Sequence, residues 1–301
     1  MSDPSSPSRY RLEQKIGEGS KGEVWRARLL TLDRDVALKV LTARGPEADE
    51  LFVREAQITA QLSHPGMPVI SDMDVLPDGR PFVAMELIRG RTVADYLTER
   101  ETDPLFGTRM LQLFEEVCRA VGYAHFCGVL HCNLQPALVM IGEFGVVKVL
   151  EWGLAKLLPG GSIRNARPDA GEATTRDANP AYMPPEQAAG DVEAITPRSD
   201  VFALGAILCH LLTGRPPYVA PDLTSLRRMA VHAELADAFR RLDASRAAKE
   251  LVEFCKRCLS ADPAGRPATA AEVACAVSVF RSRGSRGFLG WWRKILGGTS
   301  V

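Results

Sequence analysis

The sequence has no excess of charge of either sign. It contains 37 Lys and Arg residues and 37 Asp and Glu residues, so its formal net charge is zero. A chain without net positive charge has no overall field that attracts nucleic acid, so we expect no nucleic-acid partner. A long hydrophobic run is also absent. The longest apolar stretch, 201–212, is too short to cross a bilayer and is interpreted as a buried helix.

The seven cysteines are scattered, and their number is odd. Cys255 and Cys258 form a C-x-x-C pair in a helix-like stretch, but no second pair or histidine follows at the spacing of a zinc site. We therefore expect no metal there and reduced thiols, as in cytosolic proteins. No secretory signal is visible, and the Ser/Pro-rich tract 1–9 predicts a disordered segment. These features favour a cytoplasmic location.

The N-terminal part of the chain has the alternating, β-branched pattern of strands. Strands are predicted over 10–16, 23–30 and 35–41. Gly17, Gly19 and Gly22 form a G-x-G-x-x-G pattern between the first two strands, which by itself also fits a flexible hairpin. The third strand carries Lys39, and the helical stretch after it, 47–62, carries Glu55.

After residue 90 the hydrophobic period is that of helices. Helices are predicted over 92–99, 108–127, 199–213, 247–259 and 269–281. Between the second and third of them, the segment 131–140 reads His-Cys-Asn-Leu-Gln-Pro-Ala-Leu-Val-Met, and Glu-Trp-Gly follows at 151–153. Three polar residues lie farther on in distinctive contexts: Glu186 in Met-Pro-Pro-Glu, Asp200 in Ser-Asp-Val-Phe and Arg266 in Ala-Gly-Arg-Pro.

The order and spacing of these segments resemble the motifs of protein kinases, in particular the bacterial serine/threonine kinases. The resemblance covers residues 10 to about 281. It implies an α+β, two-lobed fold with an antiparallel sheet and the αC helix in an N-lobe (about 10–88) and a mainly helical C-lobe (about 89–281). Residues 1–9 and the basic, amphipathic tail 282–301 lie outside it.

The resemblance also implies a nucleotide site. The glycines would let the backbone approach phosphate oxygens, and Lys39, paired with Glu55, would contact the α- and β-phosphates. Met85 occupies the gatekeeper position, and the backbone from Glu86 to Ile88 would face the adenine edge. The adenine would lie between Val24 and Ala37 on one side and Met140 on the other. The alternatives are that Glu55 is a solvated helix charge and that the apolar residues only fill the core.

The residues that perform chemistry in the family are replaced at four positions. Asn133 stands in place of the catalytic Asp, and such a base typically contributes a factor of about 10²–10⁴ in rate. Gln135 replaces a phosphate-contacting Lys, and Leu138 replaces the metal-binding Asn with a side chain that cannot ligate Mg²⁺. Glu151 replaces the metal-binding Asp and could still hold one ion through a displaced carboxylate.

Three functions remain open from the sequence. The first is a pseudokinase that binds a protein partner, such as another kinase, and ATP with little dependence on Mg²⁺. The second is a slow serine/threonine kinase that uses Glu151 as its metal ligand, since phosphoryl transfer depends chiefly on positioning and charge neutralisation. The third is a scaffold that binds no nucleotide.

The tail contains a stripe of large apolar residues with basic neighbours. Its apolar residues are Phe288, Leu289, Trp291, Trp292, Ile295 and Leu296. Their spacing is that of one helical face. This face could contact an anionic membrane peripherally through 286–296, or it could pack on the C-lobe or on a partner protein.

Overall fold

The alternation of side chains along β3 (Arg34–Leu41) organises the N-terminal lobe. Val36, Leu38 and Val40 point to one face of the sheet, where they join a buried cluster with Phe82. Residues at the odd positions point to the other face, so Leu41 packs against the helix that follows. Because the period is two, Lys39 lies on that second face as well.

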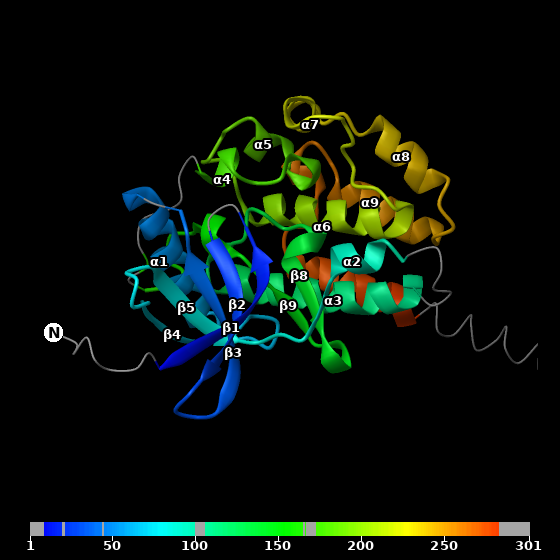
Figure 1. The fold of residues 1–301 in the computed structure, drawn as a ribbon. Coiled ribbons are helices and arrows are strands. Elements are labelled where there is room, and N and C mark those ends of the chain that lie inside the picture. Colours follow the sequence, from blue (N-terminus) through cyan, green and yellow to red (C-terminus); the bar gives the residue numbers. More distant parts are fainter. Residues whose placement is uncertain are drawn as a thin grey trace, which may run out of the picture.

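The computed structural model describes residues 9–19, 22–43, 45–99, 106–164, 166 and 173–282. The other strands of the N-terminal sheet are β1 (Tyr10–Glu18), β2 (Gly22–Leu29), β4 (Ile70–Val75) and β5 (Pro81–Glu86). The strand order is β1-β2-β3-β5-β4, with all neighbours antiparallel. Helix α1 (Pro46–Gln61) contributes Phe52 and Ala56 to the cluster at Leu41, and Figure 1 shows it beside this sheet.

The C-terminal lobe is mainly helical. Its helices include α2 (Val93–Leu97), α3 (Phe106–Phe126), α4 (Ala173–Arg176), α5 (Pro185–Ala188), α6 (Pro197–Thr213), α7 (Leu223–Val231), α8 (Ala236–Asp243) and α9 (Lys249–Cys258). A further helical segment covers 270–282. The sheet-rich N-lobe and this helical C-lobe form the two-lobed α+β arrangement expected from the sequence (Figure 1).

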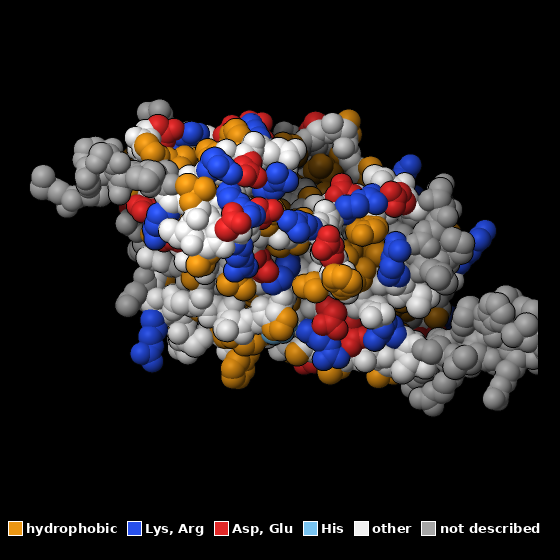
Figure 2. All heavy atoms as spheres, turned by 60° about the horizontal axis from the view of Figure 1, so that its bottom comes forward, with side chains coloured by type: hydrophobic (Ala, Val, Ile, Leu, Met, Phe, Trp, Pro, Cys, Tyr) orange, Lys and Arg blue, Asp and Glu red, His pale blue; other side chains and the backbone are white. Residues whose placement is uncertain are grey.

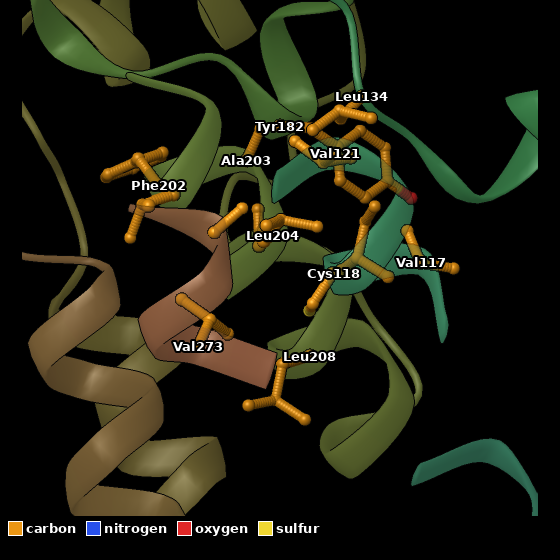
Figure 3. Close-up of a cluster of buried hydrophobic side chains, with 14 of the residues drawn as sticks. Val117, Cys118, Val121, Leu134, Tyr182, Phe202, Ala203, Leu204, Leu208 and Val273 are labelled. Atoms are coloured by element: carbon orange, nitrogen blue, oxygen red, sulfur yellow. The ribbon is translucent and has the colours of Figure 1, made fainter. Parts of the chain in front are cut away.

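Helix α6 is the centre of the C-lobe core. Its residues from Ser199 to Cys209 are all buried, so the helix is apolar nearly all round. Figure 3 shows Phe202, Leu204 and Leu208 of α6 among side chains from α3, from the loop at Leu134 and from the last helical segment. The apolar run in the sequence is therefore a buried helix, as expected.

Local sequence fixes where α6 begins and ends. Pro197 occupies the first turn, where its missing N–H costs nothing, and the Ser199 hydroxyl accepts from the backbone N–H of Thr196 at 3.1 Å. At the other end, Gly214 has a φ of 79° and donates to the carbonyl of His210 at 2.8 Å. Glycine adopts this left-handed conformation without a steric penalty. These signals place the buried start of α6 beneath the loop at 131–138.

Two small sheets hold that loop in place. β7 (Val129–Leu130) pairs with β10 (Lys156–Leu157). β6 (Gly90–Thr92), β8 (Val139–Gly142) and β9 (Val147–Val149) form a second sheet in the order β6-β8-β9. The loop 131–138 runs from β7 to β8, and the loop after β9 carries Glu151, so the two motif-bearing segments emerge side by side between the lobes.

Charged side chains of both signs are interspersed on the face that Figure 2 draws, rather than gathered by sign. Cross-strand ion pairs on the N-terminal sheet, such as Arg26–Glu13 at 3.1 Å and Arg28–Asp35 at 2.7 Å, follow the same arrangement. Within the described part of the chain, no helix combines the length and the apolar character needed to cross a membrane. The tail beyond Ser282, where the amphipathic stripe falls, lies outside the described residues.

Four helices were not predicted from the sequence: the single-turn helices α4 and α5, and the longer α7 and α8. Helix α7 is short and carries two arginines, and helix α8 carries four charged residues in eight positions, so neither has the long apolar period of the predicted helices. The signal in α8 was present nevertheless. Leu235, Ala238 and Leu242 are buried at intervals of three and four residues, which is one helical face.

Candidate functional site

The carboxylate of Asp200 fixes the loop at 131–138. It accepts from the backbone N–H of His131 at 2.8 Å and of Cys132 at 2.9 Å, and it lies 2.8 Å from Nε2 of His125. Asp200 is 1% exposed. Burial would raise the pKa of Asp200, but the hydrogen bond from His125 and the neighbouring charges outweigh it and hold that pKa below its usual value. An ionised, fully bonded carboxylate therefore anchors the loop from below.

Two residues, one in each of the segments 131–140 and 151–153, have left-handed backbone conformations. Cys132 has a φ of 61° and Glu151 a φ of 63°. Such values are uncommon outside glycine, and surrounding contacts must maintain them. His131 provides one such contact, because its Nε2 lies 3.0 Å from the carbonyl of Leu150. Its ring packs against the fully buried Trp152, whose indole N–H donates to the carbonyl of Val149 at 3.1 Å.

The ion pair expected between the β3 lysine and the α1 glutamate is present. Nζ of Lys39 lies 2.7 Å from Oε1 of Glu55 and 2.8 Å from Oε1 of Glu151. Burial would lower the pKa of Lys39, but the two carboxylates outweigh burial and raise it. A Cβ atom on Gly153 would come within 2.9 Å of Oε2 of Glu55, so a larger residue here would have to displace the end of the Glu55 side chain. Glu55 is therefore a partner of Lys39 and not a solvated helix charge.

A cavity of about 240 Å³ lies between the lobes beside this ion pair. Its lining includes residues that the sequence assigned to a nucleotide site: Gly17, Val24, Ala37, Lys39, Glu55, Met85, Glu86, Ile88 and Met140. Apolar side chains above and below with backbone groups at one edge suit a flat heterocycle. The structure brings these residues together from β1, β2, β3, α1, β5, the segment after β5, and β8.

A second cavity, of about 390 Å³, continues from the first toward the loop at 131–138. Gly17, Gly19 and Gly22 line one side of it, and Asn133, Leu138 and Glu151 line the other. A Cβ atom on Gly22 would lie 2.5 Å from the carbonyl of Val40, so close strand packing alone requires this glycine.

Mg²⁺ fits this second cavity poorly. The cation requires oxygen donors, and Leu138 offers none at the place where the family has an asparagine. Glu151 has a carboxylate there, but it is bonded to Lys39. Among the described residues, no group of three or more His, Cys, Asp or Glu side chains could hold a metal ion. The residues present therefore fit an adenine-type base better than a metal–phosphate group.

Three neutral amide side chains lie together where the family's catalytic base and phosphate-contacting lysine would be. Oδ1 of Asn133 accepts from the backbone N–H of Asn179 at 3.1 Å and from Nε2 of Gln135 at 3.4 Å. Nδ2 of Asn179 donates in turn to Oε1 of Gln135 at 2.7 Å. We call Asn133, Gln135 and Asn179 the amide cluster. The three residues are hydrogen-bonded to one another, so Oδ1 of Asn133 already accepts hydrogen bonds from within the protein.

The segment before α6 is held by a buried ion pair. The guanidinium of Arg266 donates to both carboxylate oxygens of Glu186, at 2.7 and 2.9 Å, and the Arg266 side chain is 0% exposed. The hydroxyl of Ser199 also donates to Glu186, at 2.7 Å. This two-pronged geometry is the strongest form of an Arg–carboxylate pair.

The same segment is fastened to the loop at 131–138 without a phosphate group. Nε2 of Gln187 donates to the carbonyls of Cys132 and Thr174, at 2.6 and 2.8 Å. Thr174 is 2% exposed and its hydroxyl donates to the carbonyl of Leu154, while Thr175 is also buried. Cys132 packs in an apolar cluster with Leu130 and Ile195, where an arginine would grip a phosphorylated residue in many kinases.

Residues 10–278 match the family model described as protein kinase domain. The chain belongs to the protein kinase family. It is similar to the serine/threonine-protein kinase pkn3 of Myxococcus xanthus, with 36% identity over 273 residues, which cover 87% of this chain and 48% of that protein.

Two further bacterial kinases are similar to the chain. They are the serine/threonine-protein kinases PknB of Mycolicibacterium smegmatis, 34% identical over 276 residues, and PknB of Mycobacterium tuberculosis, 33% identical over 284 residues. These matches cover 88% and 91% of this chain but only 42% and 43% of the relatives. The kinase-like chain thus spans less than half the length of the relatives that it matches.

Sequence reasoning missed two charged residues at the site. Lys148 of β9 is buried between two valines and pairs with the carboxylate of Glu86, one of the residues that line the adenine-side cavity. A lysine inside a buried strand needs a partner, which was a usable signal. Asp177 lines the second cavity close to Asn133. No local pattern marks Asp177, because only the fold brings it to the cleft.

Proposed function

We propose that this kinase-family chain is a pseudokinase: a protein that binds a purine nucleotide between its lobes and signals through a protein partner, without efficient phosphate transfer. The amide cluster is the observation that carries this proposal. A catalytic base must accept the proton of the substrate hydroxyl within hydrogen-bond distance. Oδ1 of Asn133 is an amide oxygen that accepts from Asn179 and Gln135 instead, and an amide does not take up a proton near neutral pH.

The second half of the argument concerns the transferring phosphate. In kinases, a catalytic-loop asparagine and an aspartate hold the metal ions that neutralise the phosphates. Here Leu138 lines the corresponding cavity, and the carboxylate of Glu151 is bonded to Lys39. Loss of the base and of metal neutralisation acts on the same transition state, so the losses need not add, but either one leaves a very slow enzyme.

Nucleotide binding is supported by the parts that remain. The adenine-side cavity is present, and Lys39 is paired with Glu55 as nucleotide contact requires. The relatives are named as serine/threonine kinases, a family that uses ATP. We therefore propose ATP or a related purine compound as the ligand, with Mg²⁺ contributing little to its affinity.

A slow serine/threonine kinase is the second candidate. The observation in its favour is that the ion pair of Lys39 and Glu55, the left-handed backbone at Glu151 and the anchored loop at 131–138 are all assembled. If positioning alone supplied most of the rate, this frame would support residual transfer. Its protein substrate would be chosen by surfaces that the site does not identify.

Two measurements separate these functions. Thermal-shift titration with ATP, with and without Mg²⁺, should raise the melting temperature equally in both conditions if the chain is a nucleotide-binding pseudokinase. Transfer of radiolabelled phosphate to generic protein substrates should be no greater for the wild-type chain than for Lys39→Met. Lys39-dependent transfer would establish the slow kinase instead. The absence of any shift with ATP in both conditions, and with adenosine, would leave a scaffold that binds no nucleotide.

We also propose a cytoplasmic location, with the tail 282–301 as a second contact site for a membrane or a protein. Its tryptophans and basic residues suit an interface between water and anionic lipid. Flotation with liposomes that contain anionic lipid tests the membrane half of this proposal. Equal flotation of the full chain and of a chain that ends at residue 281 would assign the tail to protein contact.

A further inference from the structure

We infer that the carboxylate of Glu151 serves as a built-in anion at Lys39, in the place of a nucleotide phosphate, so that the cleft prefers an uncharged purine nucleoside such as adenosine to ATP. The inference rests on the proposed function, because it assumes that a purine binds between the lobes. It goes further in naming the chemical class of ligand and the residue that selects it.

The geometry at Lys39 is that of a cation already bound on two sides. An ammonium group has three donors, and two of them point at Glu55 and Glu151, at 2.7 and 2.8 Å. The Lys39 side chain is only 12% exposed, so little of the group remains open to a third anion. A phosphate that entered the cleft would have to displace a carboxylate or share the one remaining donor.

Glu151 is well placed to occupy a ligand's position. Its side chain is 44% exposed and lines both cavities, so its carboxylate faces the cleft and not the core. The left-handed backbone at Glu151 directs the side chain toward β3, and the extra methylene compared with aspartate extends its reach. Its contact with Lys39 joins segments 112 positions apart in the sequence.

The charges around the second cavity oppose a phosphate chain. Its described lining residues include four carboxylates: Glu18, Glu55, Glu151 and Asp177. Lys39 is the one cation among those described lining residues. Like charges within a few ångströms of each other repel strongly where water is partly excluded. Glu18 and Asp177 are paired with Lys15 and Arg176, at 2.8 and 2.7 Å, so the repulsion comes mainly from Glu55 and Glu151. Leu138 adds no oxygen donor for a metal ion, whereas the adenine-side cavity is lined mainly by apolar side chains.

The competing interpretation is that Glu151 binds a metal ion, as the aspartate at this position does in active kinases. That role requires the carboxylate to leave Lys39 and to find a second oxygen donor at the position of Leu138. The two interpretations make opposite predictions for a neutral, isosteric substitution. Removal of a built-in anion should strengthen the binding of ATP, whereas removal of a metal ligand should weaken the binding of Mg²⁺-ATP.

Isothermal titration of the full chain with adenosine, AMP, ADP and ATP, in EDTA, tests the inference. The wild-type protein should bind adenosine most tightly and ATP most weakly. Glu151→Gln should tighten ATP binding by about tenfold and leave adenosine binding unchanged, since adenosine carries no charge. Glu143→Gln, which removes the same charge from an exposed turn, should change neither affinity. In a Lys39→Met background, the effect of Glu151→Gln on the discrimination between adenosine and ATP should shrink, because the displaced cation is gone.

Several results would overturn the inference. Tighter binding of ATP than of adenosine by the wild-type protein in EDTA would show that the phosphates are attracted. Weaker binding of Mg²⁺-ATP by Glu151→Gln would assign a metal to Glu151. If neither adenosine nor ATP binds to the wild-type protein or to Glu151→Gln, with both shown to be folded by their melting curves, the nucleotide part of the proposed function fails together with the inference.

Discussion

The substitution Arg266→Met tests how much the buried ion pair between Arg266 and Glu186 stabilises the fold. The guanidinium of Arg266 donates to Glu186 twice and to the backbone carbonyls of Ser260, Ala261 and Arg198, at distances from 2.7 to 3.1 Å. Methionine has a similar length but no donors. The variant leaves the Glu186 carboxylate, only 8% exposed, without its cationic partner and leaves three carbonyls without this donor.

The expected loss follows from this burial. Removal of one partner of a buried ion pair typically costs about 3–5 kcal/mol, because the remaining charge stays buried without compensation. For a chain of this size, each kcal/mol lowers the melting temperature by roughly 2–4 °C, so we expect a decrease of roughly 6–20 °C. The ring of Phe202 lies 4.9 Å from the guanidinium and loses that contact as well.

Urea denaturation at neutral pH measures the free energy of unfolding of each variant. The matched control is Arg228→Met, which breaks a surface pair with Glu234 at 2.9 Å and should cost about 0–1 kcal/mol. The double variant Arg266→Met/Glu186→Gln removes both buried charges and should be more stable than the sum of the single effects predicts. A loss below about 1 kcal/mol for Arg266→Met would refute the reasoning, because the pair would then not anchor the segment before α6.

Three further outcomes are expected. Four substitutions restore the family's charged groups: Asn133→Asp, Gln135→Lys, Leu138→Asn and Glu151→Asp. Together they should raise radiolabelled phosphate transfer at least about 10²-fold, and transfer that survives Lys39→Met would contradict this. Burial outweighs the nearby Asp200 and lowers the pKa of His131 below 6.5, so the folded state binds fewer protons there than the unfolded state. The free energy of unfolding should therefore fall as the pH drops below about 6.5, and His131→Gln should reduce this slope; an unchanged slope would assign it elsewhere. Gly153→Ala should lower the free energy of unfolding by about 1–3 kcal/mol and reduce the thermal shift with ATP, because its Cβ would press on Glu55. A variant as stable as the wild type would show that the Glu55 side chain has room to move.

The parts of the fold that carry a strong local signal could be predicted from the sequence. The period-two pattern of β3 places Lys39 on the face toward α1, and a cap, a proline and a final glycine delimit α6. The helices α7 and α8 were missed because their buried faces are short and their other faces are crowded with arginines. For such helices, the contacts made after folding decide the structure more than the local pattern does.

The sequence predicts which residues lie at the site, but it does not predict the hydrogen bonds and ion pairs between them. Motif spacing identified Asn133, Gln135 and Glu151 as replaced positions. Nothing in the sequence shows that the first two are bonded to Asn179, 44 to 46 positions away, or that Glu151 reaches Lys39 across 112 positions. These contacts depend on a left-handed residue and on how the two lobes meet, and both are set by long-range packing.

Lys39 contributes both to the stability of the fold and to the candidate nucleotide site. Asp200 and Arg266 are buried and fully bonded, so a change there destabilises the fold, whereas Leu138 lines a cavity and can vary at less structural cost. Lys39 lies on the cavity but is nearly buried, and a buried ammonium needs a negative partner. Either Glu55 or Glu151 can supply it, so Glu55→Gln and Glu151→Gln should each be mild.

The double variant should then lose more stability than the two single variants combined, by roughly 1–3 kcal/mol, because the ammonium of Lys39 would be left without a counter-charge. Urea denaturation of the four proteins in this cycle measures the coupling directly. Adding Lys39→Met to the double variant should restore part of the lost stability, since it removes the uncompensated charge. Additive single effects, within about 0.5 kcal/mol, would mean that water already solvates Lys39 and that neither carboxylate is needed to hold it.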